Sequence, residues 1–437
     1  MVSKNSSINR QILSLALPTL GFIVIAPLLS AIDTAFVGRL GTLSLASLGI
    51  SSSILTTSYS IFIFLSYGTT SKVGKTFGAG KIKQAYEYGF QSIWLSIFIG
   101  FCLCSLLFFF AYDIALFLGV TEEVAIQSQS YIRASLPGLF AILISLSCVG
   151  ILRGTLDTIT PLIVSVVAAI IKVICTTTFI MGFSFGLIGA GIATSISEVF
   201  IAICLITSIR RKVKGNKINY KPTKTILAAL LENIPLFIRS LTINASLILV
   251  GVTVAHFGTE VLAAHQIVYT VSVCIALLVD SVATASQSLI AVEMGRKNYE
   301  QLVSLTKQCF KFTSVIAVFV GIVIICLSHY LPIIFTNNSG LQSMAVVPIV
   351  LIGLLLPVMS FAFIGDGVLI GSGDTWYLAI AGVLNFLVYS ISLVSISKLV
   401  SSNYGLIALW LCMLIVFYGG RAVANSYRLF SYKWVKF

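Results

Sequence analysis

Six ionisable side chains interrupt long apolar stretches of this 437-residue chain. If those stretches cross a bilayer, each charge costs roughly 2.5–3.5 kcal/mol to insert, so each side chain is a candidate functional group. A carboxylate whose charged form is poorly solvated can take up a proton or a sodium ion. The six residues are Asp33, Lys172, Glu198, Arg239, Asp280 and Asp366.

Asp33 lies in the sequence APLLSAIDTAFVG, with apolar residues on both sides. It is the predicted cation-coupling group, and the alternative is a fixed ion pair with Lys172 that never titrates. Glu198 is the third member of a predicted polar pocket in this half, and a pairing of Glu198 with Lys172 would leave Asp33 free. Two prolines, Pro18 and Pro27, each remove a backbone hydrogen bond from the same stretch, so this helix is predicted to bend at Pro18. A static kink is the alternative at Pro27.

The second half of the chain has a similar set of charges. Arg239, Asp280 and Asp366 are predicted to form a polar pocket there, in which the arginine neutralises one of the aspartates. Asp157 and Asp374 precede threonines at the start of apolar stretches. They are predicted to be helix N-caps rather than ligands.

Composition identifies the elements that must position these side chains. Apolar residues make up 58% of the chain and charged residues only 9%, against roughly 25% in soluble domains. A helical span needs about 20 mostly apolar residues, and the chain offers twelve such stretches, which predicts an all-α integral membrane protein. The predicted spans are 12–37, 48–71, 86–112, 124–150, 160–181, 186–209, 227–255, 261–291, 304–331, 344–371, 375–397 and 404–427.

The basic residues predict the orientation of the chain in the membrane. With a cytoplasmic N-terminus, 21 of the 27 Lys and Arg residues fall on the inner side. This asymmetry follows the positive-inside rule, so both termini are predicted to be cytoplasmic. The net charge of +13 is therefore interpreted as a topology signal and not as a nucleic-acid-binding surface.

Comparing the sequence with itself at an offset of 217 residues reveals an internal duplication. Six spans per half give both halves the same orientation, as in transporters that rock two parallel repeats around a central cavity. The predicted organisation is two pseudo-symmetric six-helix lobes, residues 1–209 and 227–437, joined by a basic cytoplasmic linker, residues 210–226. The matching motifs are GTLSLA at Gly41 with GTEVLA at Gly258, Gly78 with Gly295, and GILRGTLDT at Gly150 with GVLIGSGDT at Gly367.

Several functional classes are disfavoured by missing motifs. The chain contains no GxxxxGK[ST], HExxH or GxSxG sequence. ATP-driven transport by this chain alone is therefore not expected, and its three histidines are not grouped as an active site would require. The chain is predicted to be no enzyme and to use no cofactor other than a coupling proton or sodium ion.

The motifs, in their order along the whole chain, resemble those of the multidrug and toxic compound extrusion (MATE) family. They are LALPTL at Leu15, IDTAFVGRLG at Ile32, FGAG at Phe77, GILRGTLDTITP at Gly150, GLIGAGIATSIS at Gly186, VLAAHQI at Val261 and GDGVLIGSGDT at Gly365. The setting of Arg239, Asp280 and Asp366 resembles the DinF-like branch. The resemblance implies a twelve-helix antiporter that expels drugs or metabolites against proton or sodium entry.

The resemblance also implies a cation site in the N-terminal lobe. Its helix 1 aspartate matches Asp33, and its helix 6 threonine matches Thr194. The Asn and Asp expected four residues apart in helix 5 fall on Lys172 and Thr176, so this chain departs from the family there. An ammonium in place of a carboxylate repels sodium, which leaves three interpretations: Asp33 couples to protons, Lys172 takes the place of the ion, or coupling has moved to the second-half acids or been lost.

The predicted function is therefore cation-coupled export of small organic compounds, cationic or aromatic in character, by alternating access. The alternative is a flippase for lipid-linked precursors of related architecture, which should have a strongly cationic cavity. Predicted partners are a small-molecule substrate and membrane lipid, with no nucleic acid. A monomer in the cell (inner) membrane is expected.

Overall fold

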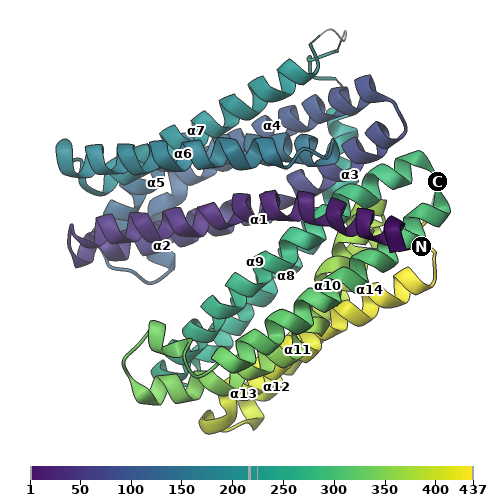
Figure 1. Cartoon of the computed structure of the whole chain (residues 1–437). Coiled ribbons are helices and arrows are strands. Elements are labelled where there is room, and N and C mark those ends of the chain that lie inside the picture. The colour runs from purple at the N-terminus through teal and green to yellow at the C-terminus, as the bar shows by residue number, and fades with distance from the viewer. Residues whose placement is uncertain (1, 215–217, 224, 436–437) are drawn as a thin grey trace. The chain divides into compact units, whose positions relative to one another are not determined.

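The computed structural model describes residues 2–214, 218–223 and 225–435, and all regular secondary structure in these ranges is helical (Figure 1). Residues 215–217 and 224 of the predicted linker lie outside the described residues. The helices are α1 (Val2–Gly38), α2 (Thr42–Ser60), α3 (Phe64–Gly78), α4 (Ile82–Phe117), α5 (Glu122–Gly154), α6 (Ile159–Thr177), α7 (Gly186–Lys212), α8 (Thr225–Ala255), α9 (Thr259–Arg296), α10 (Tyr299–Leu327), α11 (Ser339–Ser372), α12 (Thr375–Leu399), α13 (Ser402–Cys412) and α14 (Gly420–Phe430).

Within these ranges, twelve helical spans are long and apolar enough to cross a membrane, which confirms the predicted fold class. Two of the spans combine neighbouring helices. The 3₁₀ turn Ile61–Ile63 joins α2 to α3, and the π-helical segment Met413–Gly419 (η4) joins α13 to α14. A second π-helical segment, Thr178–Gly182, ends the α6 span.

Most helices extend beyond the predicted apolar stretches, because their polar end turns remain helical where the hydropathy signal has stopped. The predicted span 261–291, for example, lies inside α9. The predicted span 304–331 is an exception, because its helix α10 both starts and ends earlier than predicted, at Tyr299 and Leu327. The start is capped by the side chain of Asn298, which accepts a hydrogen bond from the Gln301 backbone N–H.

The described chain forms two compact units, each of which is described by itself. One unit is Pro18–Ile234, and the other combines Met1–Leu17 with Pro235–Phe437. Helix α1 remains helical through both of its prolines, and the division between units falls at Pro18. Its first turns belong to the second unit, where the side chain of Gln308 donates a hydrogen bond to Asn9 at 2.7 Å.

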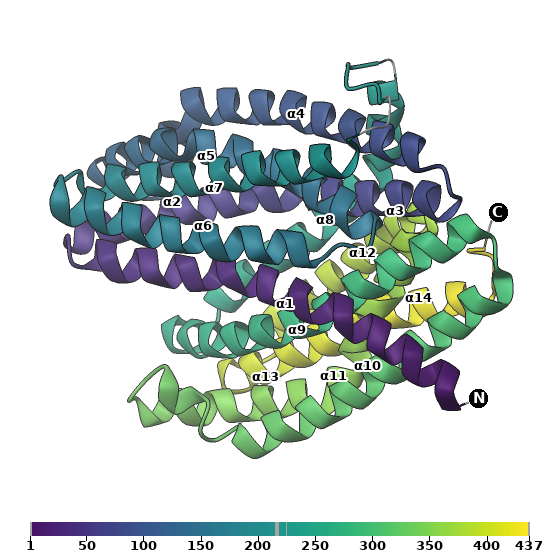
Figure 2. The ribbon, with the colours of Figure 1, turned by 45° about the horizontal axis from the view of Figure 1, so that its top comes forward.

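Each unit is organised around one central helix. In the Pro18–Ile234 unit, α5 contacts α2, α3, α4 and α7, and α4 and α7 run alongside it in both views (Figures 1 and 2). In the other unit, α11 contacts α9, α10 and α14. Helices α5 and α11 are the fourth spans of the two halves and occupy equivalent positions in the duplication.

A glycine pair on each central helix allows a very close helix–helix contact. A Cβ added to Gly150 of α5 would lie 2.7 Å from the Ser66 carbonyl oxygen, and one added to Gly367 of α11 would lie 2.5 Å from the Ala283 carbonyl oxygen. These glycines are 217 residues apart, and so are Ser66 and Ala283. A Cβ added to the second glycine of each GxxxG pair would also be too close to the neighbouring helix, at 2.9 Å from Val73 Cβ for Gly154 and 2.5 Å from the Gln287 carbonyl oxygen for Gly371. The duplicated motif is therefore a duplicated packing interface.

We predict that Gly150→Ala and Gly367→Ala each destabilise the protein by about 1–3 kcal/mol, because a backbone carbonyl cannot move aside for the added methyl group. Thermal unfolding of the purified protein in detergent measures the effect. Gly251→Ala is the matched control, since no atom lies within 4 Å of its added Cβ. Unchanged melting of both interface variants would contradict the packing argument.

Candidate ion-coupling site and a second polar pocket

Helix α6 turns one narrow face toward its own unit. The buried residues Ser165, Ala168, Lys172 and Thr176 recur at helical spacing, while isoleucines and valines between them are exposed on the surface of the chain. This periodicity is typical of a helix with one side against the protein and the other against lipid. It places Lys172 inside the unit.

Lys172 forms an ion pair with Asp33 of α1. The distance from Lys172 Nζ to Asp33 Oδ2 is 2.7 Å, and the two residues are only 7% and 5% exposed. Among the described residues, the other carboxylate oxygen, Asp33 Oδ1, is buried without a hydrogen-bond partner. The sequence left open whether Lys172 pairs with Asp33 or with Glu198, and in the structure it pairs with Asp33. One carboxylate oxygen of Asp33 remains without a hydrogen bond to any described residue.

Hydroxyl groups complete the surroundings of this pair. Thr176 lies one helical turn beyond Lys172, is fully buried, and its Oγ1 has no hydrogen-bond partner within the described ranges. Thr194 of α7 donates its hydroxyl to the Ala190 carbonyl at 3.0 Å. Tyr131 of α5, which the sequence analysis missed, is buried beside Thr194 and interacts electrostatically with Asp33.

Glu198 is a second acid close to Lys172. It lies one turn beyond Thr194 on α7, is half-buried, and interacts electrostatically with Lys172. The ion pair that Lys172 forms is nevertheless with Asp33. With both carboxylates ionised, Asp33, Glu198 and Lys172 carry a net charge of −1, so one additional positive charge would neutralise the cluster.

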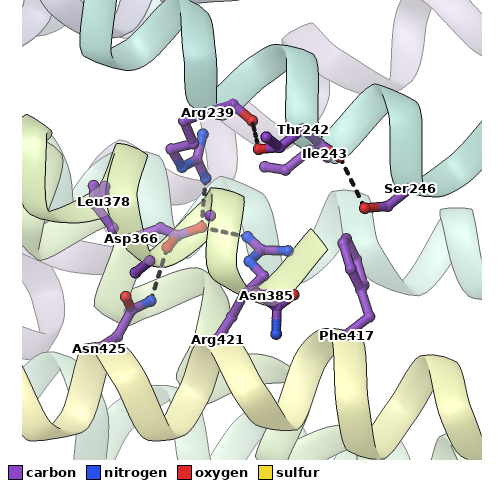
Figure 3. A pocket seen from close by; sticks show the side chains of 12 residues that line it. Arg239, Thr242, Ile243, Ser246, Asp366, Leu378, Asn385, Phe417, Arg421 and Asn425 are labelled. Carbon is purple, nitrogen blue, oxygen red and sulfur yellow. Dashed lines mark hydrogen bonds and ion pairs between the residues drawn. The ribbon is translucent and has the colours of Figure 1, made fainter. Parts of the chain in front are cut away.

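The other unit contains a second polar pocket, drawn in Figure 3. Arg239 of α8 and Arg421 of α14 both donate hydrogen bonds to Asp366 Oδ2 on α11. The amide of Asn425 donates to Asp366 Oδ1 at 2.7 Å and to the Ala362 carbonyl at 3.1 Å. The predicted neutralisation of an aspartate by Arg239 is thus present in the structure, and Asp366 is the aspartate.

Two outcomes here differ from what the spacing suggested. Asp280 lies on α9 and is not among the residues that line this pocket. Arg421 and Asn425 do line it, although the sequence analysis placed no functional residue on the last span. The pair Gly419–Gly420 directly before Arg421 was a usable signal, because adjacent glycines inside a span indicate an irregular helix.

Ion pairs at corresponding positions occur in the two repeats. Asp157 pairs with Lys212, and Asp374 pairs with Arg428 through Nε at 2.5 Å and Nη2 at 3.2 Å. Asp157 also accepts the backbone N–H of Thr160 at 3.0 Å, close to the predicted capping role. Asp374 occupies the predicted N-cap position of α12, but its carboxylate makes no capping hydrogen bond there and instead pairs with Arg428.

The charge state of Asp157 follows from these contacts. Burial raises the pKa of the carboxyl group, but hydrogen bonds from Lys212 and Thr160 outweigh burial and hold the pKa below its ordinary value. The carboxylate is therefore ionised at neutral pH. The pair with Lys212 is a true ion pair there.

Comparison with known proteins assigns this two-unit helical membrane protein to a class of transporters. The family model MatE matches residues 18–178 and again residues 235–396, together more than half of the chain. The chain therefore belongs to the MatE family of multidrug and toxic compound extrusion transporters. Because the same model matches both halves, the comparison also agrees with the internal duplication.

Individual relatives are similar over most of their lengths. The protein named DETOXIFICATION 43 of Arabidopsis thaliana is 26% identical over 98% of this chain and 91% of its own. A probable multidrug resistance protein NorM of Thermotoga maritima is 25% identical over 84% of this chain and 81% of its own. The fold matches the bent form of the Vibrio cholerae MATE transporter VcmN with a TM-score of 0.87 at 20% identity, covering 99% of this chain and 97% of that one.

Proposed function

We propose that this MATE-family transporter exports small organic compounds, cationic or aromatic in character, in exchange for protons or sodium ions. The coupling site is the cluster of Asp33, Lys172 and Glu198 in the Pro18–Ile234 unit. The observation that carries the proposal is the buried Asp33–Lys172 pair, whose carboxylate retains one unsatisfied oxygen. A buried carboxylate that is half satisfied is poised to accept a proton or to change partner.

The charge of the cluster supports coupling to one monovalent cation. Two carboxylates and one ammonium leave a net charge of −1, and uptake of one cation removes that charge from a poorly solvated site. A proton suits this arrangement better than sodium, because the ammonium of Lys172 already occupies the position beside Asp33 that a sodium ion would need. Protonation of Asp33 or Glu198 would then loosen the hold of the acids on Lys172 and let the cluster rearrange.

The class of substrate rests on the relatives. One relative is named a probable multidrug resistance protein, which supports small organic compounds as cargo. We extend the proposal to a monomer in the cell membrane. The basic residues on one side of the predicted spans support placing both termini in the cytoplasm. Alternating access between the two halves is the mechanism that parallel repeats support.

Transport by the purified protein in liposomes tests the proposal. A fluorescent cationic dye is followed while a proton gradient or a sodium gradient is imposed separately, with protein-free liposomes as the control. We expect the proton gradient to drive dye movement and an ionophore that dissipates this gradient to stop it. If neither gradient drives movement of the dye, coupled export of this class of compound would be overturned.

A further inference from the structure

A cavity of about 230 Å³ lies where α10, α11 and α14 meet the last described residues of the chain. Helices α10 and α14 lie close together in both views, near the C-terminus (Figures 1 and 2). An apolar cavity of roughly 150 Å³ already accommodates benzene, so this one can hold part of an organic molecule. Aromatic side chains form much of its wall, namely Phe310, Phe361, Phe430 and Trp434.

The last described residues build one wall of this cavity. Tyr432 adopts a left-handed backbone conformation, with a φ of 55°, where the chain turns after α14. Trp434 follows, is only 2% exposed, and its Nε1–H donates a hydrogen bond to the Leu429 carbonyl at 3.0 Å. Tyrosine and tryptophan are typical of the membrane–water interface, so this wall indicates that the cavity lies at the level of the interface.

The cavity continues into a longer apolar groove of about 1140 Å³ between α11 and the η4–α14 region. Phe361 and Ser426 line both the cavity and the groove. From Ser426 back to Ile415, the groove follows the helix for about 16 Å. That length is about half of the roughly 30 Å hydrocarbon core, which is the share of one leaflet. The groove therefore has the length and the apolar lining that an acyl chain requires.

Lys307 of α10 gives the cavity a positive charge. It is exposed, and within the described chain it is the one charged residue of the cavity lining. No carboxylate of the described ranges pairs with it, whereas Arg296 at the end of α9 is paired with Glu293. A lysine ammonium binds phosphate as a point charge. The cavity thus combines an apolar interior with a cation that can receive a phosphate group.

We propose that the cavity and the groove together bind one anionic phospholipid. Its phosphate lies beside Lys307, and one acyl chain passes Phe361 and follows α11 and α14. Lys307 falls on the predicted cytoplasmic side, and the cytoplasmic leaflet is the anionic one. A soluble anion would leave the apolar groove unfilled, and a zwitterionic lipid would gain less from the lysine. Lipid binding here does not require coupled transport, so the two proposals can fail separately.

Native mass spectrometry and thermal unfolding of the purified full-length protein in detergent test the proposal. Phosphatidylglycerol is compared with phosphatidylcholine that carries the same acyl chains. We expect one phosphatidylglycerol to bind more tightly than phosphatidylcholine and to raise the melting temperature in a saturable manner. Glycerol 3-phosphate, which has the anionic group without the chains, should have no effect. Equal stabilisation by the two lipids, or stabilisation by glycerol 3-phosphate that matches phosphatidylglycerol, would overturn the proposal.

Two variants locate the lipid. Lys307→Gln should weaken phosphatidylglycerol binding about fivefold, the contribution of one lysine beside an anionic head group, and leave phosphatidylcholine binding unaltered. Lys81→Gln, the same change at an exposed lysine outside the cavity, is the matched control and should bind as wild type. Ser426→Leu fills the junction of cavity and groove and should weaken binding, whereas Ser426→Ala keeps the junction open and should not. Undiminished phosphatidylglycerol binding in Lys307→Gln or in Ser426→Leu would refute this site.

Discussion

Asp33→Asn is expected to abolish gradient-driven transport, lowering the rate at least about tenfold at saturating dye. Asparagine is close in size to aspartate but cannot take up a proton and thereby release the Lys172 ammonium. The cluster therefore loses its coupling step. Dye flux in liposomes under an imposed proton gradient measures the effect. Asp113→Asn, the same change at an exposed aspartate of α4, is the matched control and should transport normally.

Loss of transport must be separated from loss of the fold, because Asp33→Asn leaves Lys172 buried without its partner. Removing one member of a buried ion pair typically costs about 3–5 kcal/mol, whereas removing both members is often close to neutral. The double variant Asp33→Asn with Lys172→Gln should therefore melt near the wild-type temperature and still fail to couple. Coupled transport at the wild-type rate in either variant would move the coupling site away from Asp33.

Asp366→Asn is expected to destabilise the protein by about 3–5 kcal/mol. The change removes the carboxylate shared by Arg239 and Arg421, so the two buried guanidinium groups repel each other without the charge that joins them. The melting temperature in detergent, or unfolding in a graded denaturant, measures the loss. Arg421→Gln should cost clearly less, because Asp366 keeps Arg239 and Asn425, and equal losses in both variants would contradict this account of the pocket.

The fold was predictable from the sequence because its signals are strong and repeated. Long apolar runs mark the twelve spans, and the shift of 217 residues predicts two equivalent halves. The duplicated motifs at Gly150 and Gly367 contain the GxxxG pairs at which the two central helices pack closely against their neighbours. Helix ends were less predictable, since polar end turns such as those of α9 remain helical after the hydropathy signal has ended.

The candidate sites were predictable as lists of residues but not as pairs. Sequence placed Asp33, Lys172 and Glu198 in one half, and the choice of Asp33 as partner depends on which face of α6 turns inward. Arg421 was missed because it lies near the end of the last span, where a charge normally reaches solvent. In the structure it is buried by α11 and by the aromatic residues around it, a long-range arrangement that no local spacing encodes.

The π-helical segment η4 determines the direction in which Arg421 points. A π turn accommodates one residue more than an α turn, so the register of everything after it is offset from that of α13. Deleting one residue from Met413–Gly419 would rotate α14 by about 100° about its axis and draw it back by about 1.5 Å. Arg421 and Asn425 would then leave Asp366 together. The length of this segment thus aligns the last helix with the pocket.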